Sequence, residues 1–128
     1  MRILLVDDEA EVRRVLGEFL KGVGHDVVTA ASGREAIELI ESSEHFRVAI
    51  VDWSMAGISG RDVIEHIYER SPGTLIFVAT GHSEAEVSQR HSEIPLDGIL
   101  RKPFSLRHMI REITAAVDLH QRAGNGGS

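Results

Sequence analysis

Four apolar residues at positions 3–6 are followed at once by three carboxylates, Asp7, Asp8 and Glu9. An apolar run this short, bounded by polar residues, is typical of a buried strand. Two carboxylates about 4 Å apart repel each other by about 1 kcal/mol in water and by more inside a protein. A fold gains no stability from such a cluster, so these side chains either point into solvent or enclose a cation.

Strand and helix patterns alternate five times along the chain. Apolar runs predict strands at 3–6, 25–29, 48–51, 74–79 and 98–101. Apolar residues at three- and four-residue steps predict helices around 12–23, 33–40, 63–68, 83–91 and 106–117. Ser32 and Glu35 have the spacing of a capping box. This alternation predicts an α/β fold with a doubly wound, five-stranded parallel sheet in three layers.

The apolar faces of these helices are expected to be buried, including Val15, Val23 and Tyr68. The helix at 83–91 is the exception, because only Ala85 and Val87 are apolar, so we expect it to be loosely packed or mobile.

Composition narrows the class of protein. With 128 residues, 42% of them hydrophobic, the chain can bury one core. A formal net charge of −6 argues against direct binding to nucleic acid or to a membrane surface. The absence of cysteine excludes disulfides and thiol chemistry, and no apolar run is long enough to span a membrane. We expect a cytoplasmic domain at 1–120. Residues 121–128 would be a flexible tail, a linker to another domain or a remnant of cloning.

The residues at the ends of the predicted strands form a coherent chemical set: Asp7 and Asp8, Asp52, Thr80 and Lys102. Ligands of open parallel sheets bind beyond the carboxyl ends of the strands. Three carboxylates suit Mg²⁺, and Asp52 is placed to attack phosphorus. Lys102 and the Thr80 hydroxyl can neutralise phosphoryl oxygens, and Gly81 leaves a backbone amide open to close approach.

With these residues in this order at its predicted strand ends, the chain resembles the receiver domain of two-component response regulators, from Ile3 to about Val117. The matching features are Asp7-Asp8, Asp52, Met55, Gly60, Thr80 and Lys102-Pro103-Phe104. The resemblance implies a CheY-like, flavodoxin-like fold. It also implies a signalling phosphoprotein that catalyses only its own phosphorylation and dephosphorylation, rather than an enzyme.

The resemblance also implies roles for individual residues. Asp52 would accept a phosphoryl group from a sensor histidine kinase or a histidine phosphotransfer protein. The side chains of Asp8 and Asp52, the backbone carbonyl of Ser54 and, through a water, Asp7 would hold Mg²⁺. Thr80 and Lys102 would hold the phosphoryl oxygens, and the Lys102–Pro103 bond is expected to be cis.

Phosphorylation would change the conformation of the fourth helix, fifth strand and fifth helix. That surface would regulate a partner or a fused output domain, with a homodimer as one possible assembly. Direct contact with nucleic acid or a membrane is not expected.

Some positions depart from the family pattern or modulate it. Ala56 stands where the family usually has proline, so that loop would be less rigid. Ile99 stands where the family often has an aromatic switch residue, which excludes the usual rotating ring. Ser54 and His82 would flank the attacking water and set the lifetime of the phosphoryl group. Trp53 either covers the site or only packs in the core.

Other readings of the same residues remain. The acidic run at 7–9 could be a solvated turn at a helix N-terminus. Asp52 could be a cap, Thr80 only a strand terminator and Lys102 a surface lysine. A Mg²⁺-dependent phosphohydrolase would need a second acid shortly after Asp52, where Trp53 and Ser54 stand.

Two further alternatives concern the fold as a whole. A flavin carrier would need a phosphate loop rich in glycine and hydroxyl groups, and three carboxylates would repel its ligand. A degenerate receiver, unable to take phosphate, is opposed by the intact set of Asp7, Asp8, Asp52, Thr80 and Lys102.

Overall fold

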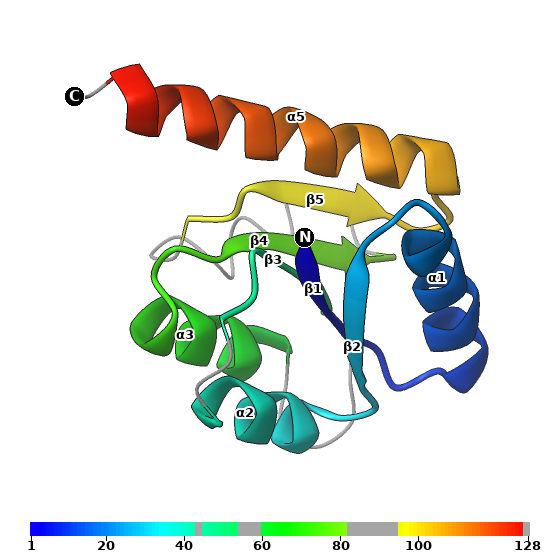
Figure 1. Ribbon diagram of the computed structural model, residues 1–128. Helices are drawn as coiled ribbons and strands as arrows, with labels where there is room; N and C mark the ends of the chain where they lie inside the picture. The colour runs from blue at the N-terminus through cyan, green and yellow to red at the C-terminus, as the bar shows by residue number, and fades with distance from the viewer. Residues whose placement is uncertain (43–44, 54–59, 82–94, 127–128) are drawn as a thin grey trace.

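The computed structural model describes residues 1–42, 45–53, 60–81 and 95–126. Five parallel strands form one sheet in the order β2-β1-β3-β4-β5 (Figure 1). The strands are β1 (Arg2–Val6), β2 (Asp26–Ala30), β3 (Val48–Asp52), β4 (Leu75–Thr80) and β5 (Gly98–Arg101). The helices are α1 (Ala10–Gly22), α2 (Gly33–Glu41), α3 (Gly60–Arg70) and α5 (Leu106–Gly126). The predicted doubly wound fold is confirmed, while the helix predicted at 83–91 lies outside the described residues.

The sheet buries both of its faces, as parallel sheets do. In β1, Ile3 and Leu5 point to the side covered by α1 and α5, whereas Leu4 and Val6 point to the side covered by α2 and α3 (Figure 1). All four residues are at most 1% exposed. This double burial explains why the strands appear in the sequence as unbroken apolar runs.

The predicted capping box opens α2. The hydroxyl of Ser32 accepts a hydrogen bond from the amide of Glu35 at 3.1 Å. The carboxylate of Glu35 accepts in turn from the amide of Ala31, also at 3.1 Å, one residue earlier than the usual partner. Two amides at the helix start are thereby satisfied.

The helix α1 ends at Gly22, in agreement with the glycines that follow its apolar pattern in the sequence. Gly24 adopts a φ of 98°, a left-handed conformation that favours glycine. The chain then turns into β2, which begins at Asp26, one residue later than predicted.

Helix periodicity overestimated burial at three positions. Val15 is 39% exposed, and Val23 and Tyr68 are each 49% exposed. In α1 the buried positions are Leu16, Gly17 and Leu20, because only a narrow stripe of the helix faces the sheet.

The last helix is longer than expected. It runs through residues 121–126, which the sequence analysis assigned to a tail. Within the described ranges, no helix is both long and apolar enough to cross a bilayer.

Candidate functional site

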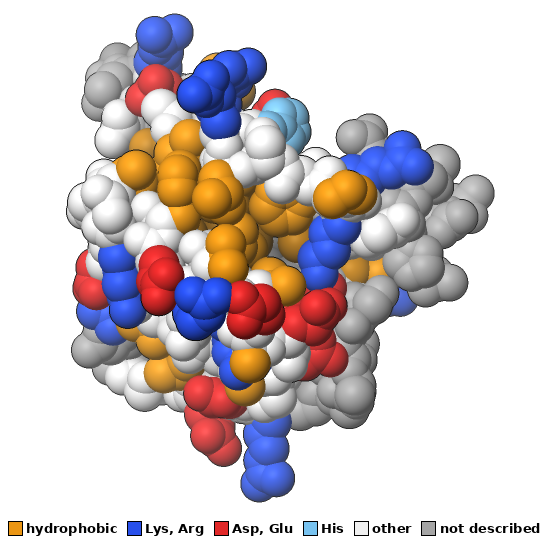
Figure 2. Space-filling model, turned by 90° about the vertical axis from the view of Figure 1, so that its right-hand side faces the viewer, with side chains coloured by type: hydrophobic (Ala, Val, Ile, Leu, Met, Phe, Trp, Pro, Cys, Tyr) orange, Lys and Arg blue, Asp and Glu red, His pale blue; other side chains and the backbone are white. Residues whose placement is uncertain are grey.

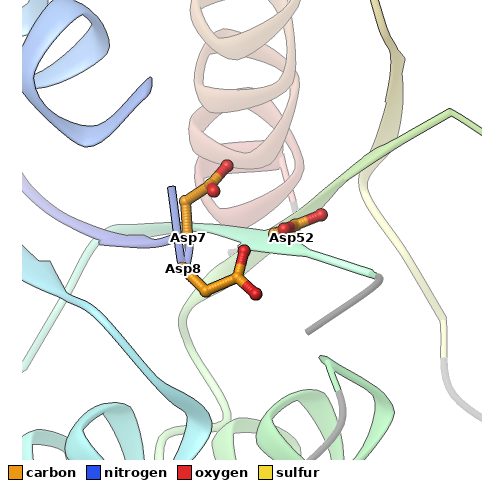
Figure 3. Close-up of side chains that lie close together, drawn as sticks. All are labelled: Asp7, Asp8 and Asp52. Atoms are coloured by element: carbon orange, nitrogen blue, oxygen red, sulfur yellow. The ribbon is translucent and has the colours of Figure 1, made fainter. Parts of the chain in front are cut away.

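Three carboxylates meet where β1 and β3 end. The two strands are neighbours in the sheet, with Val6 opposite Val51, so Asp7 and Asp52 come to the same edge. Asp7, Asp8 and Asp52 each place one carboxylate oxygen within 4.8 Å of the others (Figure 3). The predicted juxtaposition of Asp7, Asp8 and Asp52 is therefore present in the structure.

The three acidic side chains differ in burial. Asp7 is 2% exposed and Asp52 is 4% exposed, whereas Asp8 is exposed. Asp7 is held by its surroundings: its Oδ1 accepts from the amide of Glu9 at 2.9 Å, and its own amide donates to the carbonyl of Ala30 at 3.2 Å. Buried charge is costly unless it is paired, so a cation is needed nearby.

Lys102 supplies that cation from the end of β5. Its Nζ lies 3.4 Å from Asp7 Oδ2 and 3.5 Å from Asp52 Oδ1. Burial of the ammonium group lowers the pKa of Lys102, but the charges of Asp52 and Asp7 outweigh burial, so the pKa is raised above its usual value. The lysine is therefore charged at neutral pH. The Lys102–Pro103 bond is cis, as the sequence analysis expected.

Two further strand-end residues lie at this edge. Thr80 ends β4 and is 1% exposed, and its carbonyl accepts from the amide of Lys102 at 2.7 Å. A Cβ built on Gly81 would meet no atom within 4 Å, so the backbone there is accessible. The strand ends named from the sequence thus meet at one edge of the sheet, at the carboxyl ends of its strands.

Trp53 and Ile99 pack on the side of the sheet covered by α2 and α3. Trp53 is 8% exposed, belongs to the core cluster there, and donates its amide to the carbonyl of Ala79 at 2.9 Å. The packing role considered for Trp53 is therefore present, whereas covering of the site stays a prediction. Ile99 is half-buried opposite Val78.

Four positions with expected roles lie outside the described ranges. These are Ser54, Met55, Ala56 and His82.

The structure adds a reason for Gly60, which opens α3. A Cβ at this position would lie closer than 3.0 Å to the carbonyl oxygen of Asp52 and 3.0 Å from the Cα of Trp53. Real Cβ atoms essentially never approach so closely. Only glycine lets the start of α3 pack against the backbone of Asp52.

Arg13 is a residue that the sequence analysis missed. Its Nη1 donates to the main-chain oxygen of Asp7 at 2.7 Å. The only feature of the sequence that points to Arg13 is its position, six residues after Asp7 and near the start of the following helix.

An apolar groove of about 620 Å³ adjoins Lys102. Its apolar lining comes from α1, from the connection between β5 and α5 and from the first residue of α5: Val12, Val15, Leu16, Pro103, Phe104 and Leu106. Figure 2 shows apolar side chains gathered on this side of the molecule, with charged side chains around them.

The chemistry available at the site follows from these donors. All three acidic side chains offer carboxylate oxygens, which suit a hard divalent cation such as Mg²⁺. Asp52 and Lys102 place a carboxylate beside an ammonium group at the carboxyl-terminal edge of the sheet.

Comparison with known proteins identifies the family. The family model of the response regulator receiver domain matches residues 3–114. A cyclic di-GMP phosphodiesterase of Thermotoga maritima is 33% identical over 117 residues, which are 91% of this chain and 31% of that protein. A chemotaxis protein CheY homolog of Campylobacter jejuni is 36% identical over 93 residues, which are 68% of this chain and 70% of that protein.

Solved structures of receiver domains have the same fold as this chain. A CheY-like receiver domain protein from Methanospirillum hungatei superposes with a TM-score of 0.88 at 26% identity, covering 95% of this chain and 97% of that one. The match to the Thermotoga protein leaves most of that relative's length outside the alignment. The chain belongs to the response regulator receiver domain family and is a CheY-like receiver domain of two-component signalling.

Proposed function

We propose that Asp52 accepts a phosphoryl group from a phosphohistidine of a sensor histidine kinase or a histidine phosphotransfer protein. One carboxylate oxygen of Asp52 attacks phosphorus, the P–N bond to the donor imidazole breaks, and a P–O bond forms. The observation that carries this proposal is the position of Asp52: 4% exposed at a strand end, with Lys102 Nζ 3.5 Å from its Oδ1.

Lys102 and Thr80 would stabilise the transferred group. The ammonium of Lys102 is charged, because Asp52 and Asp7 hold its pKa above the usual value. It therefore opposes the negative charge that builds up on the phosphoryl oxygens. The Thr80 hydroxyl and the accessible backbone amide of Gly81 would supply neutral donors at the same edge of the sheet.

The acidic cluster fits Mg²⁺, with Asp8 and Asp52 as side-chain ligands and the Ser54 carbonyl as a third. Asp7 would contribute through a water, since both of its carboxylate oxygens already accept hydrogen bonds, from the Glu9 amide and from Lys102. When bound, Mg²⁺ offsets the negative charge of the cluster so that a phosphoryl group can approach it.

The apolar groove beside Lys102 supports docking of the phosphodonor. It lies between α1 and the connection that leads into α5, and it is lined in part by Lys102, whose Nζ is 3.5 Å from Asp52 Oδ1. Apolar patches rimmed by polar residues often mark protein interaction sites.

Phosphorylation would then shift a conformational equilibrium that is read by a partner or a fused output domain in the cytoplasm. The surface involved would be formed by β5, α5 and the helix predicted at 83–91, which lies outside the described residues, with Ile99 at the position of the usual aromatic switch. Ser54 and His82 would set how long the phosphoryl group survives, and self-association through this surface would give a homodimer.

Incubation with acetyl phosphate and Mg²⁺ tests the proposal. Intact mass should increase by one phosphoryl group, the adduct should be labile to hydroxylamine, and Trp53 fluorescence should change. Asp52→Ala and Asp52→Asn should show none of these effects. No adduct on the wild-type protein, or an equal adduct on Asp52→Ala, would refute the proposal.

A further inference from the structure

Arg13 reaches back from α1 to the acidic turn that precedes the helix. Its Nη1 donates to the main-chain oxygen of Asp7 at 2.7 Å in a partly buried environment. The neighbouring Arg14 points elsewhere and pairs on the exposed surface with Glu11 and Glu18. Of these two adjacent arginines, Arg13 is the one bonded to the acidic turn.

The bonded oxygen belongs to the peptide group that joins Asp7 to Asp8. A peptide group is planar, so the Asp7 carbonyl oxygen and the Cα of Asp8 lie in one plane. A strong hydrogen bond to that oxygen therefore restricts the direction in which Asp8 leaves the strand. Hydrogen bonds from a charged guanidinium are among the stronger ones in proteins.

Asp8 depends on this restraint more than Asp7 does. Asp7 is also held through its side chain, by the Glu9 amide at 2.9 Å and by Lys102 at 3.4 Å. Asp8 is exposed, and no hydrogen bond or ion pair to its carboxylate is found within the described part of the chain. Its approach to the other two carboxylates, within 4.8 Å, is therefore set mainly by its backbone.

We propose that Arg13 is a positioning residue of the divalent-cation site. It holds the peptide group between Asp7 and Asp8 so that the Asp8 carboxylate faces Asp52. This inference rests on the proposed Mg²⁺ site, but it concerns a residue outside the ligand set.

Two effects of Arg13 on cation binding have opposite signs. Its positive charge repels Mg²⁺, so neutralising the side chain would strengthen binding if charge alone mattered. Its hydrogen bond preorganises Asp8, so losing the bond should weaken binding. The direction of the change in Mg²⁺ affinity therefore distinguishes the two.

The experiment measures the Mg²⁺ dissociation constant by Trp53 fluorescence at fixed ionic strength for wild type, Arg13→Met, Arg13→Lys and the control Arg14→Met. Arg13→Met should weaken binding about three- to tenfold, which is the range expected for loss of one typical hydrogen bond. Arg13→Lys, which keeps the charge and one donor position, should lie between wild type and Arg13→Met. Arg14→Met should stay within about twofold of wild type because it leaves the bond to Asp7 intact.

The unfolding free energy without Mg²⁺ separates positioning from general stabilisation. A merely structural Arg13 would lower stability without changing the Mg²⁺ affinity of the folded protein. Equal or tighter Mg²⁺ binding by Arg13→Met overturns the inference while leaving the proposed function intact. If Arg13→Met does not fold, wild-type affinity in Arg13→Lys overturns it. A wild-type protein that binds no Mg²⁺ overturns both proposals.

Discussion

Lys102 Nζ lies 3.5 Å from Asp52 Oδ1, although β4 separates their two strands in the sheet. Side chains of a strand alternate between its two faces, and Ile50 and Leu100 both point toward α1 and α5. Asp52 and Lys102 follow them by two residues and so project on that same side. The contact between acid and amine is thus a product of strand register.

Lys102→Ala should bind Mg²⁺ at least as tightly as the wild-type protein. The ammonium lies within 3.5 Å of two carboxylates, so its removal eliminates a positive charge that competes with the cation. The gain should reach up to about tenfold in the dissociation constant, limited by solvent screening. A Mg²⁺ titration of Trp53 fluorescence measures it, with the exposed Lys21→Ala as control for net charge. Loss of Mg²⁺ binding in Lys102→Ala would contradict the role given to Lys102.

Lys102→Ala should also separate phosphorylation of Asp52 from the conformational change that follows it. Lys102→Ala should still acquire a phosphoryl adduct from acetyl phosphate, at a reduced rate, because the attacking carboxylate of Asp52 remains. The adduct should no longer alter Trp53 fluorescence, since the contact to the phosphoryl oxygens is missing. Intact mass and fluorescence followed in one sample test this, and a wild-type fluorescence change would argue against it.

The pH dependence of stability should reveal the Lys102 cluster at alkaline pH. Asp52 and Asp7 raise the pKa of folded Lys102 above the unfolded value of about 10.4. The resulting stabilisation is complete below that unfolded pKa and is lost as pH rises through the higher folded pKa. Denaturant unfolding between about pH 9 and 12 should therefore show a steeper loss for wild type than for Lys102→Met. Parallel curves would mean that the lysine gains nothing from its acidic neighbours.

Gly60→Ala should destabilise the fold and disturb the site. The added Cβ would press on the carbonyl of Asp52 and the Cα of Trp53, which are backbone atoms and cannot rotate away. Overpacking of this kind typically costs about 1–3 kcal/mol. Gly22→Ala is the matched control, because a Cβ there meets no atom within 4 Å. Denaturant unfolding measures both, and equal stabilities would show that the start of α3 shifts freely.

Much of the fold could be predicted from the sequence because its signals are local. Each strand is buried on both faces, so it appears as an apolar run, and the polar residue that ends it marks the binding edge. The capping box at Ser32 and Glu35 depends on residues three apart, and the structure contains the Ser32 bond as predicted, with the Glu35 carboxylate bonded to the amide of Ala31 in place of that of Ser32.

What could not be predicted depends on contacts between distant segments. Val15 fits the apolar period of α1, yet it is 39% exposed because the helix turns only a narrow stripe toward the sheet. The hydrogen bond from Arg13 to Asp7 and the approach of Gly60 to Asp52 have no sequence pattern of their own. Each requires the relative placement of a helix and a strand end.

Mg²⁺ should stabilise the wild-type protein against unfolding but not Asp8→Asn. A ligand that binds only the folded state adds about 2.7 kcal/mol at a hundredfold excess over its dissociation constant. Asp8→Asn removes one of three carboxylates that lie within 4.8 Å of each other, so it should relieve repulsion and stabilise the metal-free protein. Denaturant unfolding with and without Mg²⁺ measures both effects, and exposed Glu9→Gln serves as control for charge near the turn. Equal Mg²⁺ stabilisation of wild type and Asp8→Asn would place the cation elsewhere, because no site that uses Asp8 as a ligand keeps its affinity after this substitution.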